Sequence, residues 1–223
     1  MSNIIFAFAT VLSFSMCSPK SADVANAQVD KTETEKKIDL AGKSSAVFAS
    51  GCFWCVEAVF ESVEGVSEAV SGYAGGKAST ATYQMVSSGR SKHAEAVEVF
   101  YDPDVISYET LLEVFFGSQD PTTLNQQGPD RGPQYRSTIF YKNDIEKLAA
   151  ENYIAKLTSD KIFDDPITTT LEPLVAFFDA EDYHQDYEAR NPNQPYIKGV
   201  SVPRLNKFKA KFPHLLNKSV SKH

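Results

Sequence analysis

The sequence predicts a globular protein of α+β fold without a disulfide-stabilised scaffold, and three observations lead to that prediction. Apolar residues recur at helical spacing in some segments and alternate in others, so helices and strands follow one another along the chain. Hydrophobic residues make up 42% and charged residues 23% of the 223 residues, as in an ordinary globular protein of one domain or two. The three cysteines, Cys17, Cys52 and Cys55, are too few for a disulfide-stabilised scaffold.

The first predicted elements are a strand, a helix and a strand. A short strand over residues 46–49 ends at Gly51. Apolar residues between 56 and 63 then recur at i, i+3, i+4 and i+7 with glutamates on the other side, which is the pattern of an amphipathic helix. Residues 66–73 read as a second strand, which the turn signal Gly75-Gly76 closes.

The same order follows a second time. Residues 94–101 alternate as a strand, residues 111–117 form a helix that ends at Gly117, and residues 137–141 form another strand. A further helix covers 145–157. Two strand–helix–strand units in succession are the split βαβ arrangement, so we expect a ferredoxin-like two-layer sandwich with additional helices.

Beyond residue 160 we expect a long C-terminal loop region with a few short elements. Residues 167–171 suggest a strand and 182–189 a short helix. The Asn- and Pro-rich stretch 191–195 reads as loop, and a basic helix over 204–211 closes the domain.

The N-terminus begins with an apolar run of 11 residues, Ile4 to Phe14. A membrane-spanning helix needs about 20, so the run is a signal-peptide core or a buried segment. Cys17 follows shortly after it, and an apolar run that ends at a cysteine resembles a bacterial lipoprotein signal, in which Cys17 would be lipidated. The alternatives are cleavage after the A-x-A site that ends at Ala27, and an uncleaved cytosolic N-terminus.

We therefore divide the chain into a signal segment over 1–17, a flexible polar tether over 18–43, a catalytic domain over 44–217 and a tail over 218–223. The tether carries five basic and five acidic residues, so the net charge of −7 belongs to the rest of the chain. That charge argues against nucleic acid or an anionic membrane surface as the main partner. We expect an exported protein, periplasmic or anchored to a membrane only through Cys17, and a cytoplasmic one if the N-terminal segment is no signal.

The pair Cys52 and Cys55 lies in a C-x-x-C motif between a strand and the start of a helix. Helix-terminal N–H groups favour a thiolate, so we expect the pKa of Cys52 to lie below its usual value of about 8.5. The spacing brings the two sulfurs to one side of the helix, within reach of a disulfide. Phe53 and Trp54 place an apolar wall beside them.

The cysteine motif is compatible with more than one chemistry. A structural zinc site needs four ligands; there is no second cysteine pair and the four histidines are scattered, so we expect no metal. Two inert core cysteines are a further alternative. A thioredoxin-like thiol–disulfide exchanger also carries C-x-x-C near a βαβ pattern, and the motif alone does not separate it from another thiol enzyme.

Several further sequence motifs, in the order in which a known family of thiol enzymes carries them, bear on which chemistry the two cysteines perform. Between about residues 44 and 212 the sequence resembles the A-type peptide methionine sulfoxide reductases. The matching runs are GCFWCVEAVF (51–60), GYAGG (72–76), Thr82-Tyr83, HAEAVEVFYDP (93–103), DRGPQYRS (130–137) and EDYHQDY (181–187).

The resemblance implies a role for Cys52 and for Glu95. Cys52 would attack the sulfoxide sulfur and become a sulfenic acid as methionine is released. Glu95 would donate the proton to the departing oxygen. The residue pattern agrees, because Glu95 shares a strand face with Val97 and Val99, and a desolvated carboxyl keeps its proton near neutral pH.

The resemblance also implies a substrate pocket. Tyr83 and Tyr135 would donate hydrogen bonds to the sulfoxide oxygen. Phe53 and Trp54 would hold the S-methyl group, Asp130 would accept a hydrogen bond from the substrate backbone, and His184 would line the same pocket.

Many members of this family recycle the nucleophile with a cysteine near the C-terminus, but here no cysteine follows Cys55. We therefore expect a Cys52–Cys55 disulfide after each turnover, reduced by thioredoxin or a thioredoxin-like partner. The expected enzyme is a monomer without a cofactor that reduces methionine S-sulfoxide in proteins, peptides and the free amino acid. Lys92 and Pro133 differ from the commoner family residues, at the rim of the pocket.

Overall fold

The computed structural model describes residues 40–218. The expected signal segment with Cys17, nearly all of the tether, and residues 219–223 of the tail lie outside the described residues. In the part that is described, no helix has the length and apolar character to cross a membrane.

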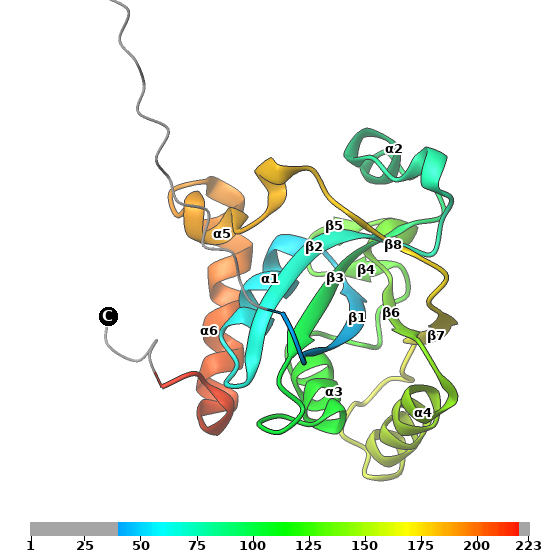
Figure 1. Cartoon of the computed structure of the whole chain (residues 1–223), viewed down its shortest axis with the longest axis vertical. Helices are drawn as coiled ribbons and strands as arrows, with labels where there is room; N and C mark the ends of the chain where they lie inside the picture. Colours follow the sequence, from blue (N-terminus) through cyan, green and yellow to red (C-terminus); the bar gives the residue numbers. More distant parts are fainter. Residues whose placement is uncertain (1–39, 219–223) are drawn as a thin grey trace, which may run out of the picture. The chain divides into compact units, whose positions relative to one another are not determined.

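The centre of the domain is a six-stranded sheet with strand order β7-β6-β1-β3-β2-β8 (Figure 1). The inner order β6-β1-β3-β2 is antiparallel throughout and is that of the ferredoxin-like fold, so this prediction is confirmed. β7 joins one edge parallel to β6, and β8 joins the other edge antiparallel to β2. The strands are β1 Ser44–Ser50, β2 Val66–Ala74, β3 Ala94–Tyr101, β6 Ser137–Tyr141, β7 Thr170–Pro173 and β8 Phe177–Asp179. A separate two-stranded ribbon pairs β4 Gln126–Gln127 with β5 Asp130–Arg131.

The helices follow the sheet in the order that the sequence predicts, with additions. The α-helices are α1 Phe53–Glu61, α2 Tyr83–Ser87, α3 Tyr108–Gly117, α4 Asp144–Ser159, α5 Tyr187–Arg190 and α6 Val202–Lys211. A π-helical turn, η4 Ile197–Ser201, leads directly into α6. The 3₁₀ turns are η1 Ala78–Thr80, η2 Pro133–Tyr135, η3 Asp182–His184 and η5 Pro213–Leu215.

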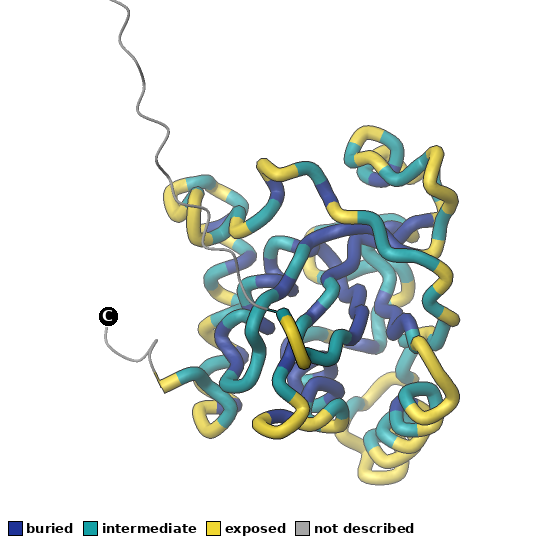
Figure 2. Tube along the Cα trace, viewed as in Figure 1, coloured by how far each residue is buried: buried dark blue, intermediate teal, exposed yellow. Residues whose placement is uncertain are grey.

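The main core lies between the sheet and the helices α1 and α3. Phe48 of β1 stacks on Phe60 of α1 at 5.1 Å and on Phe115 of α3 at 5.3 Å between ring centroids. All three side chains are buried, and Figure 2 shows the buried stretch running through α1 and the central strands. Each such ring contributes roughly 1.5–3 kcal/mol by leaving water. This packing fixes α1, which begins one residue after Cys52.

The opposite face of the sheet carries a smaller apolar cluster. Val47, Ala96 and Phe140 belong to it, and Leu174 and Phe177 of the C-terminal region pack over them. The long C-terminal region therefore covers this face before it returns to the other side of the sheet.

The C-terminal region differs from the prediction in detail. The strand expected over 167–171 is displaced to Thr170–Pro173, and the helix expected over 182–189 is broken into η3 and α5. The break falls at Asp186, which has a left-handed φ of 52°. Its backbone N–H donates a hydrogen bond to the carboxylate of Glu57 on α1. A tertiary contact, which local periodicity does not encode, therefore interrupts the helix.

Candidate active site

The chain passes from β1 to α1 through Gly51, which has a φ of +86°. A Cβ atom at this position would lie 2.6 Å from Cβ of Gln127, so both the backbone angle and the space require glycine. Cys52 follows as the N-cap residue of α1, and its own side chain makes no capping hydrogen bond. The thiol of Cys52 thus lies at the N-terminus of the helix.

Cys52 borders a cavity of about 200 Å³. The cavity collects residues from the start of α1, from α2, from β3, from the β5–η2 segment and from the loop before η4, which are far apart in the sequence. Its nine lining residues are Cys52, Phe53, Trp54, Tyr83, Glu95, Asp130, Tyr135, Gln194 and Tyr196.

Glu95 projects from β3 into this cavity, and only 2% of the residue is exposed. Its Oε2 atom accepts a hydrogen bond from the backbone N–H of Phe53 at 3.2 Å. Burial raises the pKa of Glu95 to about 8, although the hydrogen bond from Phe53 opposes that shift. The carboxyl therefore holds a proton at neutral pH. Val97 and Val99, on the same strand face, lie in the main core as expected.

The thiols of Cys52 and Cys55 are buried and form no disulfide. They titrate as a coupled pair, and their pKa values shift in opposite directions. Burial raises the pKa of Cys52 well above its usual value, and the hydrogen bond with Cys55 adds to that effect. The same bond lowers the pKa of Cys55 to about 6, with help from the charge of Arg204 and from hydrogen bonds with Ser201 and Tyr196. In the reduced pair the negative charge resides on Cys55.

The expectation that the helix N-terminus lowers the pKa of Cys52 is therefore wrong for the reduced pair. The backbone N–H of Trp54 does favour the thiolate of Cys52, as a helix start should. Desolvation and the nearby charges of Cys55 and Glu95 outweigh it.

Comparison with known proteins places this arrangement of residues in one family. The family model for peptide methionine sulfoxide reductase matches residues 44–216. The chain is 49% identical over 175 residues to "Peptide methionine sulfoxide reductase MsrA 2" of Mesorhizobium japonicum, covering 78% of this chain and 90% of that protein. It is also 49% identical over 171 residues to "Peptide methionine sulfoxide reductase MsrA 1" of Rhodopirellula baltica, covering 77% and 88%.

The chain belongs to the peptide methionine sulfoxide reductases. Solved structures of the family agree with this assignment. Reduced Mxr1 from Saccharomyces cerevisiae superposes with a TM-score of 0.66 at 34% identity, covering 71% of this chain and 91% of that one. Methionine sulfoxide reductase A of Corynebacterium diphtheriae gives 0.61 at 33% identity, covering 69% and 77%. The resemblance predicted from the motifs is confirmed, and with it a methionine sulfoxide reductase in preference to a general thiol–disulfide exchanger.

In this reductase the two expected tyrosines both border the cavity of Cys52. Tyr83 begins α2 and Tyr135 ends η2. Burial raises the pKa of Tyr83 to about 12 and that of Tyr135 above its usual range. Both hydroxyls therefore stay protonated at neutral pH and are available as hydrogen-bond donors.

Trp54 forms the apolar wall of the reductase cavity together with Phe53. Contacts with Tyr187 and His184 fix the position of its indole ring. Its indole ring stacks on Tyr187 with 3.7 Å between centroids and 8° between planes. Its Nε1–H donates a hydrogen bond to Nδ1 of His184 at 3.1 Å. His184 is 1% exposed and does not line the cavity, so the expectation that it does is wrong. It supports the cavity wall, because it accepts the hydrogen bond of Trp54 and its ring packs against those of Phe53 and Tyr83, at 5.0 Å and 4.4 Å between centroids.

Tyr196 is the site residue that the sequence reasoning missed. Its hydroxyl donates a hydrogen bond to Oδ2 of Asp130 at 2.5 Å and lies 3.8 Å from Sγ of Cys55. Burial raises the pKa of Asp130, and the bond from Tyr196 opposes this. Asp130 thus lies in the cavity as expected, but already has one partner. Tyr196 follows a segment that reads as loop, and nothing in the residue pattern singles it out from ten tyrosines.

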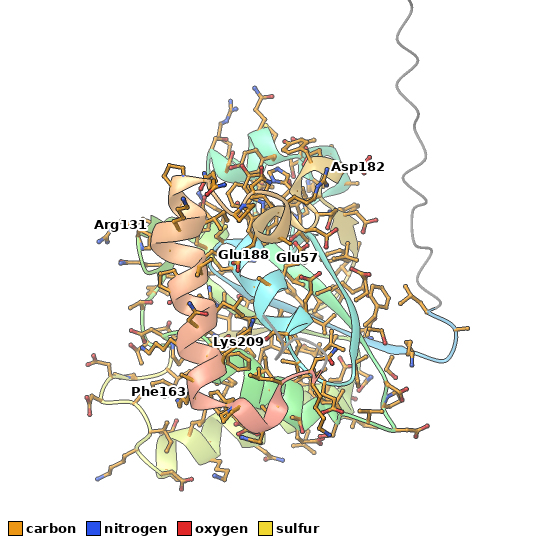
Figure 3. The ribbon with its side chains drawn as sticks, turned by 90° about the vertical axis from the view of Figure 1, so that its left-hand side faces the viewer. Glu57, Arg131, Phe163, Asp182, Glu188 and Lys209 are labelled. Carbon is orange, nitrogen blue, oxygen red and sulfur yellow. The ribbon has the colours of Figure 1, made fainter. Side chains whose placement is uncertain are left out.

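An acidic cluster anchors the segment that carries His184 and Tyr187. Glu57 and Glu61 of α1 and Asp186 have oxygen atoms within 4.8 Å of one another. Burial raises the pKa of Glu57 to about 7 and that of Glu61 to about 9. Figure 3 shows Glu57 on α1 and Glu188 on the short helix α5 that follows Asp186. The cluster joins this segment to the helix of the two cysteines.

Proposed function

We propose that this reductase reduces the S epimer of methionine sulfoxide in proteins, in peptides and as the free amino acid, with Cys52 as its nucleophile. One observation carries the assignment of roles. The thiol of Cys52 and the protonated, buried carboxyl of Glu95 border the same small cavity. The neutral side chains of Tyr83 and Tyr135 border it as well. Repair of oxidised proteins follows from such an activity.

In the first step the substrate's S-methyl group lies against Phe53 and Trp54, where apolar contact favours it. The hydroxyls of Tyr83 and Tyr135 donate to the sulfoxide oxygen. Glu95 gives its proton to that oxygen while the sulfur of Cys52 attacks. Oxygen is transferred to Cys52, whose own proton passes to the carboxylate of Glu95; Cys52 becomes a sulfenic acid, and methionine leaves.

In the second step Cys55 attacks the sulfenic sulfur of Cys52. The charge of Arg204 and the hydrogen bonds with Ser201 and Tyr196 favour the thiolate of Cys55, which is the form that reacts. The disulfide forms as the S–O bond of the sulfenic acid breaks, and the departing hydroxide takes up a proton and leaves as water. In our assignment Cys55 is the resolving cysteine because it lies in the first turn of α1, within hydrogen-bond reach of Cys52.

The disulfide between Cys52 and Cys55 must be reduced before the next turnover, and the location of the protein decides which reductant can reach it. A thioredoxin or thioredoxin-like dithiol reduces the disulfide, and the enzyme acts as a monomer. If the N-terminal segment is a signal, the protein is periplasmic or held at a membrane by lipidated Cys17, and its reductant is supplied on that side. Mass spectrometry of the mature N-terminus tests this, because an acylated Cys17, a free Gln28 and an intact Met1 give different masses.

Incubation with a peptide that contains methionine sulfoxide, with dithiothreitol as reductant, tests the activity. We expect methionine to form from the S epimer and not from the R epimer, and we expect none with Cys52→Ser. Equal rates with both epimers, or methionine formation by the serine variant, would contradict the proposal. Reduction of disulfides such as those of insulin, without methionine formation, would favour a thiol–disulfide exchanger.

A further inference from the structure

The two cysteines border different cavities. Cys52 lines the substrate cavity described above, whereas Cys55 lines a second cavity of about 390 Å³ beside α6. Asp130 and Tyr196, joined by their hydrogen bond, line both and so form the partition between them. We call the second one the Cys55 cavity.

The wall of the Cys55 cavity holds a fixed positive charge. Arg204 of α6 donates from Nε to the carbonyl of Ser118 at 2.7 Å, and from Nη1 to the carbonyl of Ser50 at 2.9 Å. Its charge favours the thiolate of Cys55. Lys207, one turn further along α6, also lines the cavity and is exposed. Two cations therefore border the path to the sulfur, against the carboxylates of Asp120 and Asp130.

Two glycines line the same cavity. At Gly128 and at Gly199 an added Cβ atom would meet no atom within 4 Å, so open space lies in front of both. The absence of side chains there leaves room for the loop of another protein to approach. The substrate cavity is about half as large, and the rings of Phe53, Trp54 and Tyr83 border it.

We propose that the Cys55 cavity receives the reactive cysteine of a thioredoxin-type dithiol protein, which attacks Sγ of Cys55 and not that of Cys52. This inference rests on the proposed function, because it needs the Cys52–Cys55 disulfide. The reductant and the methionine sulfoxide would therefore reach the two cysteines through different cavities.

The exchange balances in two steps. The reductant's thiolate attacks Cys55, a mixed disulfide forms, the bond between Cys52 and Cys55 breaks, and Cys52 leaves as a thiolate and takes up a proton. The second thiol of the reductant then attacks the sulfur of the reductant's first cysteine, which is bonded to Cys55 in the mixed disulfide. Cys55 leaves as a thiolate beside Arg204, and the reductant departs oxidised, having supplied two electrons.

A trapping experiment tests which sulfur is attacked. The full chain, oxidised by one turnover of methionine sulfoxide, is mixed with a thioredoxin whose second active-site cysteine is replaced by serine. Chymotrypsin cleaves after Phe53 and Trp54, so mass spectrometry separates Cys52 from Cys55. We expect the mixed disulfide on Cys55; a mixed disulfide on Cys52 overturns the proposal.

A variant that fills the cavity mouth gives a second test. In Gly199→Phe we expect kcat/KM for thioredoxin to fall at least tenfold, without a rise in KM for the sulfoxide. Asn206→Phe, also exposed on α6 but outside the cavity lining, is the matched control and keeps wild-type values. Unchanged kcat/KM for thioredoxin in Gly199→Phe overturns the proposal. If the wild type releases no methionine in one turnover, the proposed function fails; if it does, and the mixed disulfide lies on Cys52, only this inference fails.

Discussion

The carboxylate of Glu95 accepts a hydrogen bond at 3.2 Å from the backbone N–H of Phe53, the residue directly after Cys52. One bond thus sets the position of the Glu95 carboxyl relative to the thiol of Cys52. The N–H group lies in the first turn of α1, where it favours a negative charge, and burial acts in the opposite direction. Their balance leaves the pKa of Glu95 at about 8, in the range that suits a general acid.

Replacing Glu95 by glutamine removes the proton donor and keeps an oxygen that accepts from Phe53. We expect the rate of methionine release in a single turnover to fall by about 10²–10⁴-fold. Glu98→Gln is the matched control, because Glu98 lies on the opposite face of β3, where Oε1 accepts from Ser45 at 2.7 Å. A loss below threefold in Glu95→Gln would contradict the assigned role.

The rate of methionine release should depend on pH through Glu95. The active form carries the proton, so the single-turnover rate is high below the pKa of about 8 and declines about tenfold per pH unit above it. Rapid quenching over pH 6 to 10 measures this profile. The alkaline decline should disappear from the residual rate of Glu95→Gln, and its persistence there would assign the titration to another group.

Cys55→Ser separates the two chemical steps. Methionine release in one turnover should remain, since Cys52 and Glu95 are both present, whereas thioredoxin-driven cycling should fall by at least a hundredfold. A sulfenic acid on Cys52 should accumulate and react with dimedone. Undiminished cycling with thioredoxin would rule out Cys55 as the resolving cysteine.

His184 should act on the substrate through the cavity residues that it contacts, above all Trp54. In His184→Phe the indole N–H loses its acceptor, so we expect KM for the sulfoxide to rise several-fold with a smaller change in kcat. Trp54 is the only tryptophan of the chain, so its fluorescence reports directly on this contact. His214→Phe, exposed in η5, should change neither quantity. An unchanged emission spectrum in His184→Phe would argue against the supporting role.

Glu61→Gln should stabilise the protein at high pH. The pKa of Glu61 is raised by burial to about 9, so the folded state binds more protons than the unfolded state between the usual pKa of 4.5 and about 9. Stability is therefore fullest below 4.5 and is lost as pH rises towards 9. We expect a Tm gain of about 2–4 °C at pH 9, the shift that roughly 1 kcal/mol gives in a domain of this size, and almost none at pH 4.

The control for this experiment is Glu64→Gln, just beyond the end of α1 and 3.7 Å from Lys218. Its effect on Tm should stay small at both pH values, because Glu64 lies outside the acidic cluster. A Tm gain in Glu61→Gln that is equal at pH 4 and pH 9 would show that proton binding is not its cause.

Local patterns were enough to predict the central fold and the places of the two cysteines and Glu95, whereas Tyr83, Tyr135 and Asp130 were expected only from the resemblance to the family. The alternation of residues 94–101 placed Glu95 on the same face as Val97 and Val99, and the periodicity of α1 placed both cysteines at its start. The short elements β8 and α2 were not predicted, and neither was the break at Asp186. Those features depend on partners such as β2 and Glu57, which no local window contains.

The sequence by itself determined that Cys52 and Cys55 lie together at a helix start and that Glu95 lies on the apolar face of its strand, because spacing and strand parity are local properties that survive folding unchanged. Only the tertiary structure decided which sulfur holds the negative charge and which cavity each sulfur borders. The charge depends on burial and on Arg204, which bonds to Ser50 across 154 positions of the chain. The cavities depend on Tyr196 and Asp130, 66 positions apart, meeting as a wall between Cys52 and Cys55. Desolvation and long-range charge arise only when distant segments pack together.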